Sequence, residues 1–191
     1  MLSGMFMMVL ETLAGLITML LLVRTAMRWM RISFINQLGQ FILATTNWIV
    51  LPAQKILPSV GKLDLSALVP AWVLQMLLVV LTVLLSGSGF GNPASALIGV
   101  MAIGALLLLR TTLYLLMGVV ILSAVLSWVN PYAPIAPMVN ALTRPFLEPI
   151  RRVVPPLGGV DLSPLVLLLV IQVLVFVLNT LHGNLIPLLY S

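Results

Sequence analysis

Long apolar stretches alternate with shorter polar segments along this chain. Four stretches are long and apolar enough to cross a membrane as helices, which takes about 20 residues each; they cover roughly residues 7–30, 65–85, 94–129 and 164–181. The third has 36 residues and a single charge, Arg110. It is either a span over residues 110–129 preceded by an interfacial helix, or one long tilted helix. We favour a continuous or gently bent helix, because no proline interrupts it after Pro93.

The two halves of the chain repeat each other. Seven residues recur 97 positions later: Pro52, Pro58, Gly61, Asp64, Leu65, Ser66 and Gln75 return as Pro149, Pro155, Gly158, Asp161, Leu162, Ser163 and Gln172. Trp29 recurs as Trp128, 99 positions on. We therefore predict a first repeat over residues 1–86, a Gly- and Ser-rich connector over 87–94 and a second repeat over 95–191. Two spans in each repeat make the repeats parallel.

Each repeat consists of a span, an amphipathic linker and a second span. The predicted fold is an all-α membrane protein with four transmembrane helices, arranged as two parallel tandem helix hairpins that each carry an interfacial linker helix. Composition agrees, since 62% of the residues are hydrophobic and 7% are charged, whereas soluble domains have about 25% charged residues. The net charge of +5 does not indicate nucleic-acid binding, because the basic residues lie in loops between spans. The positive-inside rule places both long loops in the cytoplasm and both termini outside.

The residue inventory argues against several kinds of site. The chain has no Cys and one His, His182, which excludes disulfides and Cys nucleophiles and argues against a His-based metal site within one chain. It has no nucleotide-binding glycine loop and no Ser-His-Asp set. We therefore expect no cofactor, no metal and no catalytic activity.

The linker of the second repeat carries a group of basic residues. Its apolar residues recur at helical spacing, while Arg144, Arg151 and Arg152 lie toward the other side. One interpretation is a helix that lies on the membrane surface and tethers two spans. The other is a binding site for anionic lipid or a partner protein, with Lys55 as the first repeat's contribution, because each basic residue near an anionic surface contributes about 1 kcal/mol.

Three arginines near the end of the first span form a polar stripe. Arg24, Arg28 and Arg31 stand at i, i+4 and i+7 and share one helix face. Their counterparts in the second repeat are uncharged: Ser123, Ser127 and Asn130. Arg28 and Arg31 can snorkel to the interface. Arg24 lies deeper, and either it snorkels too or it faces protein, with Asp64 or Asp161 as its candidate partner.

The two aspartates stand just before the predicted second span of each repeat. Ser163 followed by Pro164 is typical of a helix start with Ser as the N-cap. Asp161 stands just before it, where the positive end of the helix dipole stabilises a negative charge. Capping is one interpretation of both aspartates. The alternative is that Asp64 and Asp161 form a pseudo-symmetric pair of carboxylates that binds a cation or a partner's arginine.

Two opposite charges stand one repeat apart inside the apolar stretches. Glu11 and Arg110 are separated by 99 positions, so we expect them at equal depth on equivalent helices. An unpaired charge in a membrane costs upward of about 2.5 kcal/mol, so the two should form an ion pair between the repeats. That pair either fixes the packing of the repeats or acts in gating or ion relay. Gln75 and Gln172 are expected to make interhelical hydrogen bonds.

The linker motifs resemble those of a known family. Residues 144–152 read RPFLEPIRR and residues 155–164 read PPLGGVDLSP. With Ser127 and Trp128 before them, they resemble the signature of the YggT family of bacterial membrane proteins, which has YlmG relatives in Gram-positive bacteria and plastids. The first half matches too, with two departures: Gln54 and Lys55 replace the double arginine, and Lys62 replaces the second glycine.

This resemblance implies an inner-membrane protein linked to osmotic tolerance and potassium homeostasis and, in relatives, to cell division or the assembly of membrane complexes. It implies no agreed biochemical activity. Both termini would then be periplasmic. Our first hypothesis is an accessory or scaffold protein that binds other membrane proteins, a second copy of itself or lipid through its linkers. The alternative is a component of an ion pathway, with Glu11, Arg110 and Arg24 as the candidate charges along it.

Overall fold

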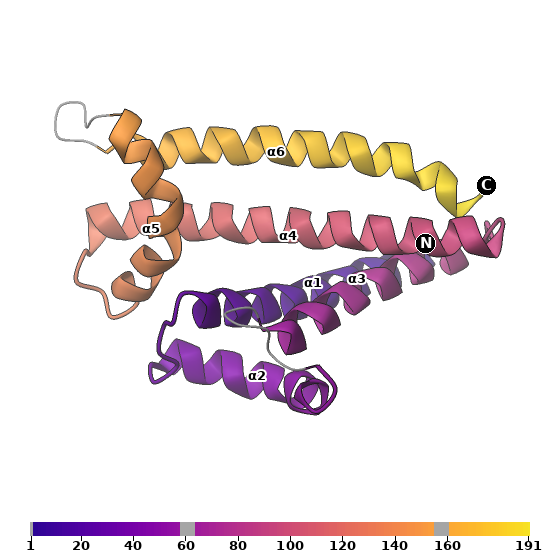
Figure 1. Ribbon diagram of the computed structural model, residues 1–191, viewed down its shortest axis with the longest axis horizontal. Helices are drawn as coiled ribbons and strands as arrows, with labels where there is room; N and C mark the ends of the chain where they lie inside the picture. Colours follow the sequence, from indigo (N-terminus) through magenta and orange to yellow (C-terminus); the bar gives the residue numbers. More distant parts are fainter. Residues whose placement is uncertain (1, 58–63, 155–160) are drawn as a thin grey trace.

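The protein is described by a computed structural model over residues 2–57, 64–154 and 161–191 (Figure 1). Its elements are α1 (Leu2–Trp29), α2 (Gln37–Gln54), α3 (Leu65–Leu85), α4 (Pro93–Val129), α5 (Ala136–Val153), α6 (Ser163–Leu185) and the 3-10 helix η1 (Ile186–Leu189). These described ranges contain no strand. Four of the recurring residues lie outside them: Pro58, Gly61, Pro155 and Gly158. The all-helical prediction is confirmed.

Four of these helices, α1, α3, α4 and α6, are long and apolar enough to cross a membrane, as predicted. α1 packs on α3, α3 on α4 and α4 on α6. The third predicted stretch is one continuous helix, α4, of 37 residues. Asn92 is the N-cap of α4, and its side chain accepts a hydrogen bond from the backbone N–H of Ala94 (2.9 Å). At 1.5 Å per residue α4 is about 55 Å long, against a hydrocarbon core of about 30 Å.

The two repeats pack their helices in the same way. The linker helix of each repeat, α2 or α5, packs against both spans of that repeat. At the centre of each repeat lies a buried apolar cluster: Leu21, Val50, Ala67 and Ala71 in the first, and Val120, Leu147, Leu167 and Ile171 in the second. Val50 and Leu147 are 97 positions apart, and Leu21 and Val120 are 99 apart. The duplication read from the sequence therefore extends to the core.

α4 joins the repeats, because it packs against α1 and α3 of the first repeat and against α5, α6 and η1 of its own part of the chain. Gly104 lets α3 come close: a Cβ there would lie 2.7 Å from Cγ of Met76 and 3.3 Å from its backbone N. Figure 1 shows both termini at one end of the bundle and α5 across the opposite end. We call these the terminus end and the linker end.

Candidate functional site

The first repeat buries a carboxylate at the linker end. Asp64, just before α3, has only 1% of its side chain exposed. Nη1 of Arg28, in the last turn of α1, lies 2.9 Å from its Oδ2, and Ser66 Oγ donates to its Oδ1. A buried charge is stable only when it is paired and hydrogen-bonded. Asp64 therefore has a complete set of partners within its own repeat.

Arg24 has a different set of partners from the one expected. Its side chain is buried and Nη1 donates to Thr46 Oγ1 (2.8 Å) and Asn47 Oδ1 (2.9 Å), both on α2. Among the described residues no ion pair joins Arg24 to either aspartate that was considered as its partner; Arg28 makes the ion pair with Asp64. The reason is depth, since Arg28 is one turn nearer the helix end, level with the start of α3. Arg31 is exposed just after α1, in the left-handed backbone region at φ 56°.

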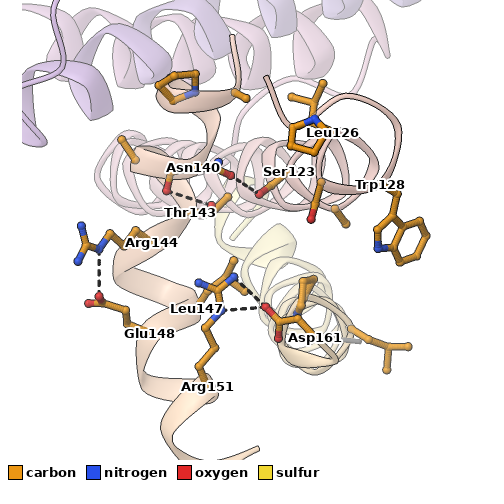
Figure 2. A pocket seen from close by; sticks show the side chains of 18 of the residues that line it. Ser123, Leu126, Trp128, Asn140, Thr143, Arg144, Leu147, Glu148, Arg151 and Asp161 are labelled. Atoms are coloured by element: carbon orange, nitrogen blue, oxygen red, sulfur yellow. Dashed lines mark hydrogen bonds and ion pairs between the residues drawn. The ribbon is translucent and has the colours of Figure 1, made fainter. Parts of the chain in front are cut away.

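In the second repeat the corresponding space is open. Ser123 and Ser127 stand where the first repeat has Arg24 and Arg28. A cavity of about 1,050 Å³ lies there between α4, α5 and α6 (Figure 2). We call it the linker-end groove; its polar lining residues are Ser123, Ser127, Asn140, Thr143, Arg144, Glu148, Arg151 and Asp161. Its apolar lining includes Leu126, Leu165 and Leu168, which lie on the spanning helices.

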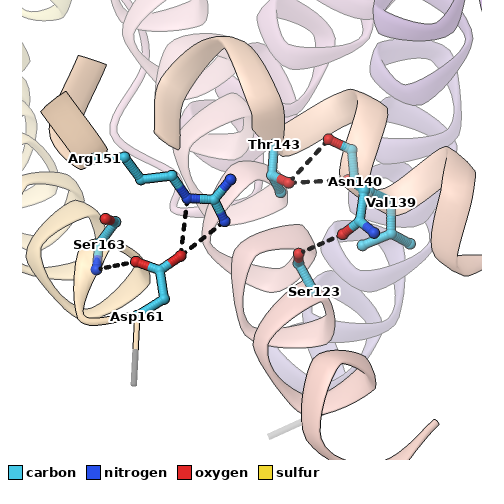
Figure 3. A network of polar contacts seen from close by, with 7 residues as sticks. All are labelled: Ser123, Val139, Asn140, Thr143, Arg151, Asp161 and Ser163. Carbon is cyan, nitrogen blue, oxygen red and sulfur yellow. Dashed lines mark hydrogen bonds and ion pairs between the residues drawn. The ribbon is translucent and has the colours of Figure 1, made fainter. Parts of the chain in front are cut away.

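One ion pair crosses the groove from α5 to the start of α6. Both Nε and Nη2 of Arg151 lie 2.8 Å from Oδ2 of Asp161. Oδ1 of Asp161 accepts the backbone N–H of Ser163 at 2.9 Å (Figure 3). Asp161 therefore caps α6, whereas the prediction that Ser163 is the N-cap is wrong, because Ser163 is the first residue of the helix.

The environment of Asp161 favours its charged form. Partial burial alone would raise its pKa, but the hydrogen bonds from Ser163 and Arg151 and the positive charge of Arg151 lower it below the ordinary value. Ser123 Oγ donates to Asn140 Oδ1 at 3.0 Å on the neighbouring wall of the groove (Figure 3).

The basic residues of the linkers do not form one free patch. Arg144 pairs with Glu148 on the same helix (3.0 Å), and Arg151 pairs with Asp161. Three ion pairs occur in the described part of the chain, and neither Arg152 nor Lys55, both exposed, takes part in them. Carboxylates therefore neutralise two of the three arginines that suggested an anionic-lipid site.

The two aspartates do not form the carboxylate pair that was considered as an alternative. Asp64 is paired with Arg28 and Asp161 with Arg151, each inside its own repeat. Within residues 2–57, 64–154 and 161–191, no three His, Cys, Asp or Glu residues come together as metal ligands.

Glu11 and Arg110 line a second cavity, of about 390 Å³, toward the terminus end. The ion pair expected between them is not among those of the described residues, which corrects that prediction. Nη1 of Arg110 instead donates to Asn179 Oδ1 on α6 (3.3 Å), while Glu11 is exposed on α1. Equivalent positions on α1 and α4 do not bring Glu11 and Arg110 into an ion pair, because the Arg110 side chain reaches toward α6.

The two expected glutamine contacts also differ. Gln75 is buried and its Nε2 donates to Thr18 Oγ1 (3.1 Å), an interhelical bond between α3 and α1. Gln172, its counterpart on α6, is exposed, so the prediction is wrong there.

Several polar residues of these sites were missed in the sequence. They are Thr46, Asn47, Asn140, Thr143 and Asn179. Thr46 and Thr143 are 97 positions apart and both are buried, so the repeat offset would have singled them out. The others have no such signal, because Asn47 corresponds to Arg144 and Asn140 to Leu43.

Comparison with known proteins gives a consistent result. The family model described as CCB3/YggT matches residues 3–85 and 102–182, once for each half. A Vibrio alginolyticus protein, described as an uncharacterized protein in the proC 3' region, is 34% identical over 174 residues, covering 91% of this chain and 92% of the relative. The uncharacterized protein YggT of Escherichia coli K12 is 32% identical, covering 86% and 84%. An uncharacterized Pseudomonas aeruginosa protein is 35% identical, covering 91% and 88%. No solved structure matches.

Proposed function

This chain belongs to the CCB3/YggT family, and from that premise we propose that it is a non-catalytic accessory or scaffold protein of the bacterial inner membrane. It acts by binding a partner membrane protein or lipid in the linker-end groove of its second repeat. The observation that carries the proposal is the difference between the repeats at one position. The first repeat fills the space with Arg24 and Arg28, whereas the second leaves a cavity of about 1,050 Å³.

The groove suits binding better than catalysis. Its ionisable groups are arginines and carboxylates that pair with one another, so no group is held unpaired beside a nucleophile, as a general base would be. Its wall combines polar side chains with leucines of the spanning helices. A ligand with a polar end and an apolar end therefore matches it.

Charge distribution supports the orientation of the molecule that this role requires. Except for Arg110, the Lys and Arg residues of the described chain lie in the linkers or near the linker ends of the spans. By the positive-inside rule we place the linkers in the cytoplasm and both termini in the periplasm. Reporter fusions at the C-terminus and in the loop between α1 and α2 test this. Periplasmic activity of the loop fusion would contradict it.

The binding role is tested by cross-linking in native membranes. A photo-reactive residue placed at Leu126, inside the groove, should give one stoichiometric adduct of the full chain. The same residue at Phe176, an exposed position on α6 far along the helix from its start, is the control. Filling the groove with Ser127→Arg should remove the adduct formed at Leu126. Equal adducts with and without Ser127→Arg would contradict the proposal.

The same protein in liposomes separates this role from ion permeation. An accessory protein gives no flux of potassium above that of empty vesicles. Flux that Glu11→Gln or Arg110→Gln reduces would instead favour an ion pathway through the cavity at the terminus end. A strain that lacks the protein, tested for growth at high osmolarity, shows whether the link to osmotic tolerance holds here.

A further inference from the structure

The groove of the second repeat differs from the first repeat in the placement of its charges, not only in its volume. The spanning helix loses two cations, because Ser123 and Ser127 replace Arg24 and Arg28. The linker helix gains two, because Arg144 and Arg151 replace Asn47 and Gln54. The aspartate is kept, but its cation now comes from α5 rather than from the spanning helix.

As a result the aspartate of the second repeat is accessible. The side chain of Asp64 is 1% exposed, whereas that of Asp161 is 39% exposed and that of Arg151 is 51% exposed. Arg151 directs two N–H groups at the single oxygen Oδ2 and does not use its planar fork on both oxygens. The remaining N–H groups of Arg151 and the second lone pair of Oδ1, which accepts only the N–H of Ser163, are therefore available to a ligand.

The groove lies at the linker ends of two spanning helices, α4 and α6. Ser123 and Ser127 are in the last two turns of α4, and Leu165 is in the first turn of α6. Leu126, Leu165 and Leu168 continue its wall toward the apolar part of the bundle, and Leu165 is 56% exposed. We place this end of the helices at the level of the lipid headgroups, with acyl chains beside the leucines.

We infer that the linker-end groove binds one phospholipid with a zwitterionic amine headgroup, of the phosphatidylethanolamine type. Its phosphate accepts hydrogen bonds from Arg151, and its primary ammonium donates to Asp161 from the side that Arg28 occupies in the first repeat. Its chains lie along Leu165 and Leu168. This ligand carries one anion and one cation, which matches the one cation and one anion that the groove presents across α5 and α6.

The charges favour this headgroup over the two nearest alternatives. An anionic lipid would place its extra negative charge in a groove that already holds the carboxylates of Asp161 and Glu148. A quaternary ammonium, as in phosphatidylcholine, has no N–H to donate to Asp161. An arginine from a partner protein would satisfy Asp161 but would leave the leucine wall without a matching apolar group.

The inference rests on the proposed function and names its ligand. The full chain is reconstituted with vesicles that contain equal amounts of phosphatidylethanolamine, phosphatidylcholine and phosphatidylglycerol, then exchanged into detergent. The lipid that remains bound is identified by native mass spectrometry. We expect about one phosphatidylethanolamine per chain and about a tenfold preference over phosphatidylcholine, the effect of one charged hydrogen bond.

Variants connect that lipid to the groove. Ser127→Arg puts the arginine of the first repeat into the second and should abolish retention. Asp161→Asn should bring phosphatidylethanolamine down to the level of phosphatidylcholine, so the inference stays testable if Ser127→Arg does not fold. Arg152→Gln, which changes an exposed residue outside the groove lining, is the matched control and should retain the lipid.

Two outcomes overturn the inference. Equal retention of the three lipids means that the headgroup is not recognised, and a preference for phosphatidylglycerol means that the arginines outweigh Asp161. If either occurs while the Leu126 adduct to a partner protein still depends on an open groove, the proposed binding role stands and only its ligand changes. If that adduct is also insensitive to Ser127→Arg, the proposed function fails as well.

Discussion

Asp64 and Asp161 occupy equivalent positions but have different surroundings. Asp64 is buried and contacts Arg28 and Ser66, whereas Asp161 is partly exposed beside Arg151. A buried carboxylate that loses its cation keeps the desolvation cost without the compensating attraction. The stability of the first repeat should therefore depend on its ion pair much more than that of the second.

Arg28→Met tests this dependence. We expect it to lower the free energy of unfolding by about 1–3 kcal/mol, because the buried Asp64 loses its ion-pair partner. Arg152→Met, at an exposed position, should change it by less than about 0.5 kcal/mol. Thermal unfolding in mild detergent measures both. Adding Asp64→Asn to Arg28→Met should recover most of the loss; a double variant weaker than the single one would refute the pairing.

Stability should also fall in acid through Asp161. Its pKa in the folded protein lies below the ordinary value of 3.8, so the folded state favours the charged form. The contribution of this carboxylate is complete above the pKa of the unfolded chain and is lost as the pH falls through the lower, folded pKa. Unfolding curves recorded between pH 3 and 7 should show this loss below about pH 4. Asp161→Asn should flatten that part of the profile, and an unchanged profile would contradict it.

The sequence revealed the charged residues at this scale but not all of their partners. Arg24 and Arg28 share a helix face, so spacing alone cannot say which of them meets Asp64. That depends on the level at which α3 begins relative to the end of α1, which packing decides. Arg151 and Asp161 were both singled out, but their contact depends on how α5 lies against α6.

At the scale of elements, α4 is the helix on which the fold depends. The absence of internal proline predicted its full length, and the structure has it unbroken over 37 residues. What the sequence could not indicate is that Gly104 permits the close approach of α3 while Gly118 faces open space. The two glycines differ only in what lies opposite them.

Valine at these two positions separates packing from helix propensity. Gly104→Val forces a side chain into Met76, including its backbone, and should cost about 1–3 kcal/mol of stability. A Cβ at position 118 meets no atom within 4 Å, and Gly118→Val carries the same change in propensity, so it should stay within about 0.5 kcal/mol of the parent. Unfolding in detergent measures both; equal effects would mean that the α3–α4 contact is not tight.

For the whole molecule, the repeat was the most informative pattern in the sequence. The offsets of 97 and 99 residues predicted two equivalent units, and the family match over residues 3–85 and 102–182 agrees with that division in outline. The offsets also bring Ser127 into register with Arg28, but the open groove follows only once the helices are placed. Neighbouring side chains can repack to fill the space left when serine replaces arginine, but in the second repeat they do not.

The central position of α4 has a consequence for how the protein is made. Val79 and Val83 of α3 pack in one cluster with Val100, Ile103 and Leu189. Because α3 enters the bilayer while α4 is still being translated, these two valines at first have no protein neighbour from the second repeat. Acyl chains are as apolar as those valines, so the contact of α3 with lipid before α4 arrives costs little free energy. Insertion of the first hairpin and its later docking onto α4 are therefore separable events in biosynthesis.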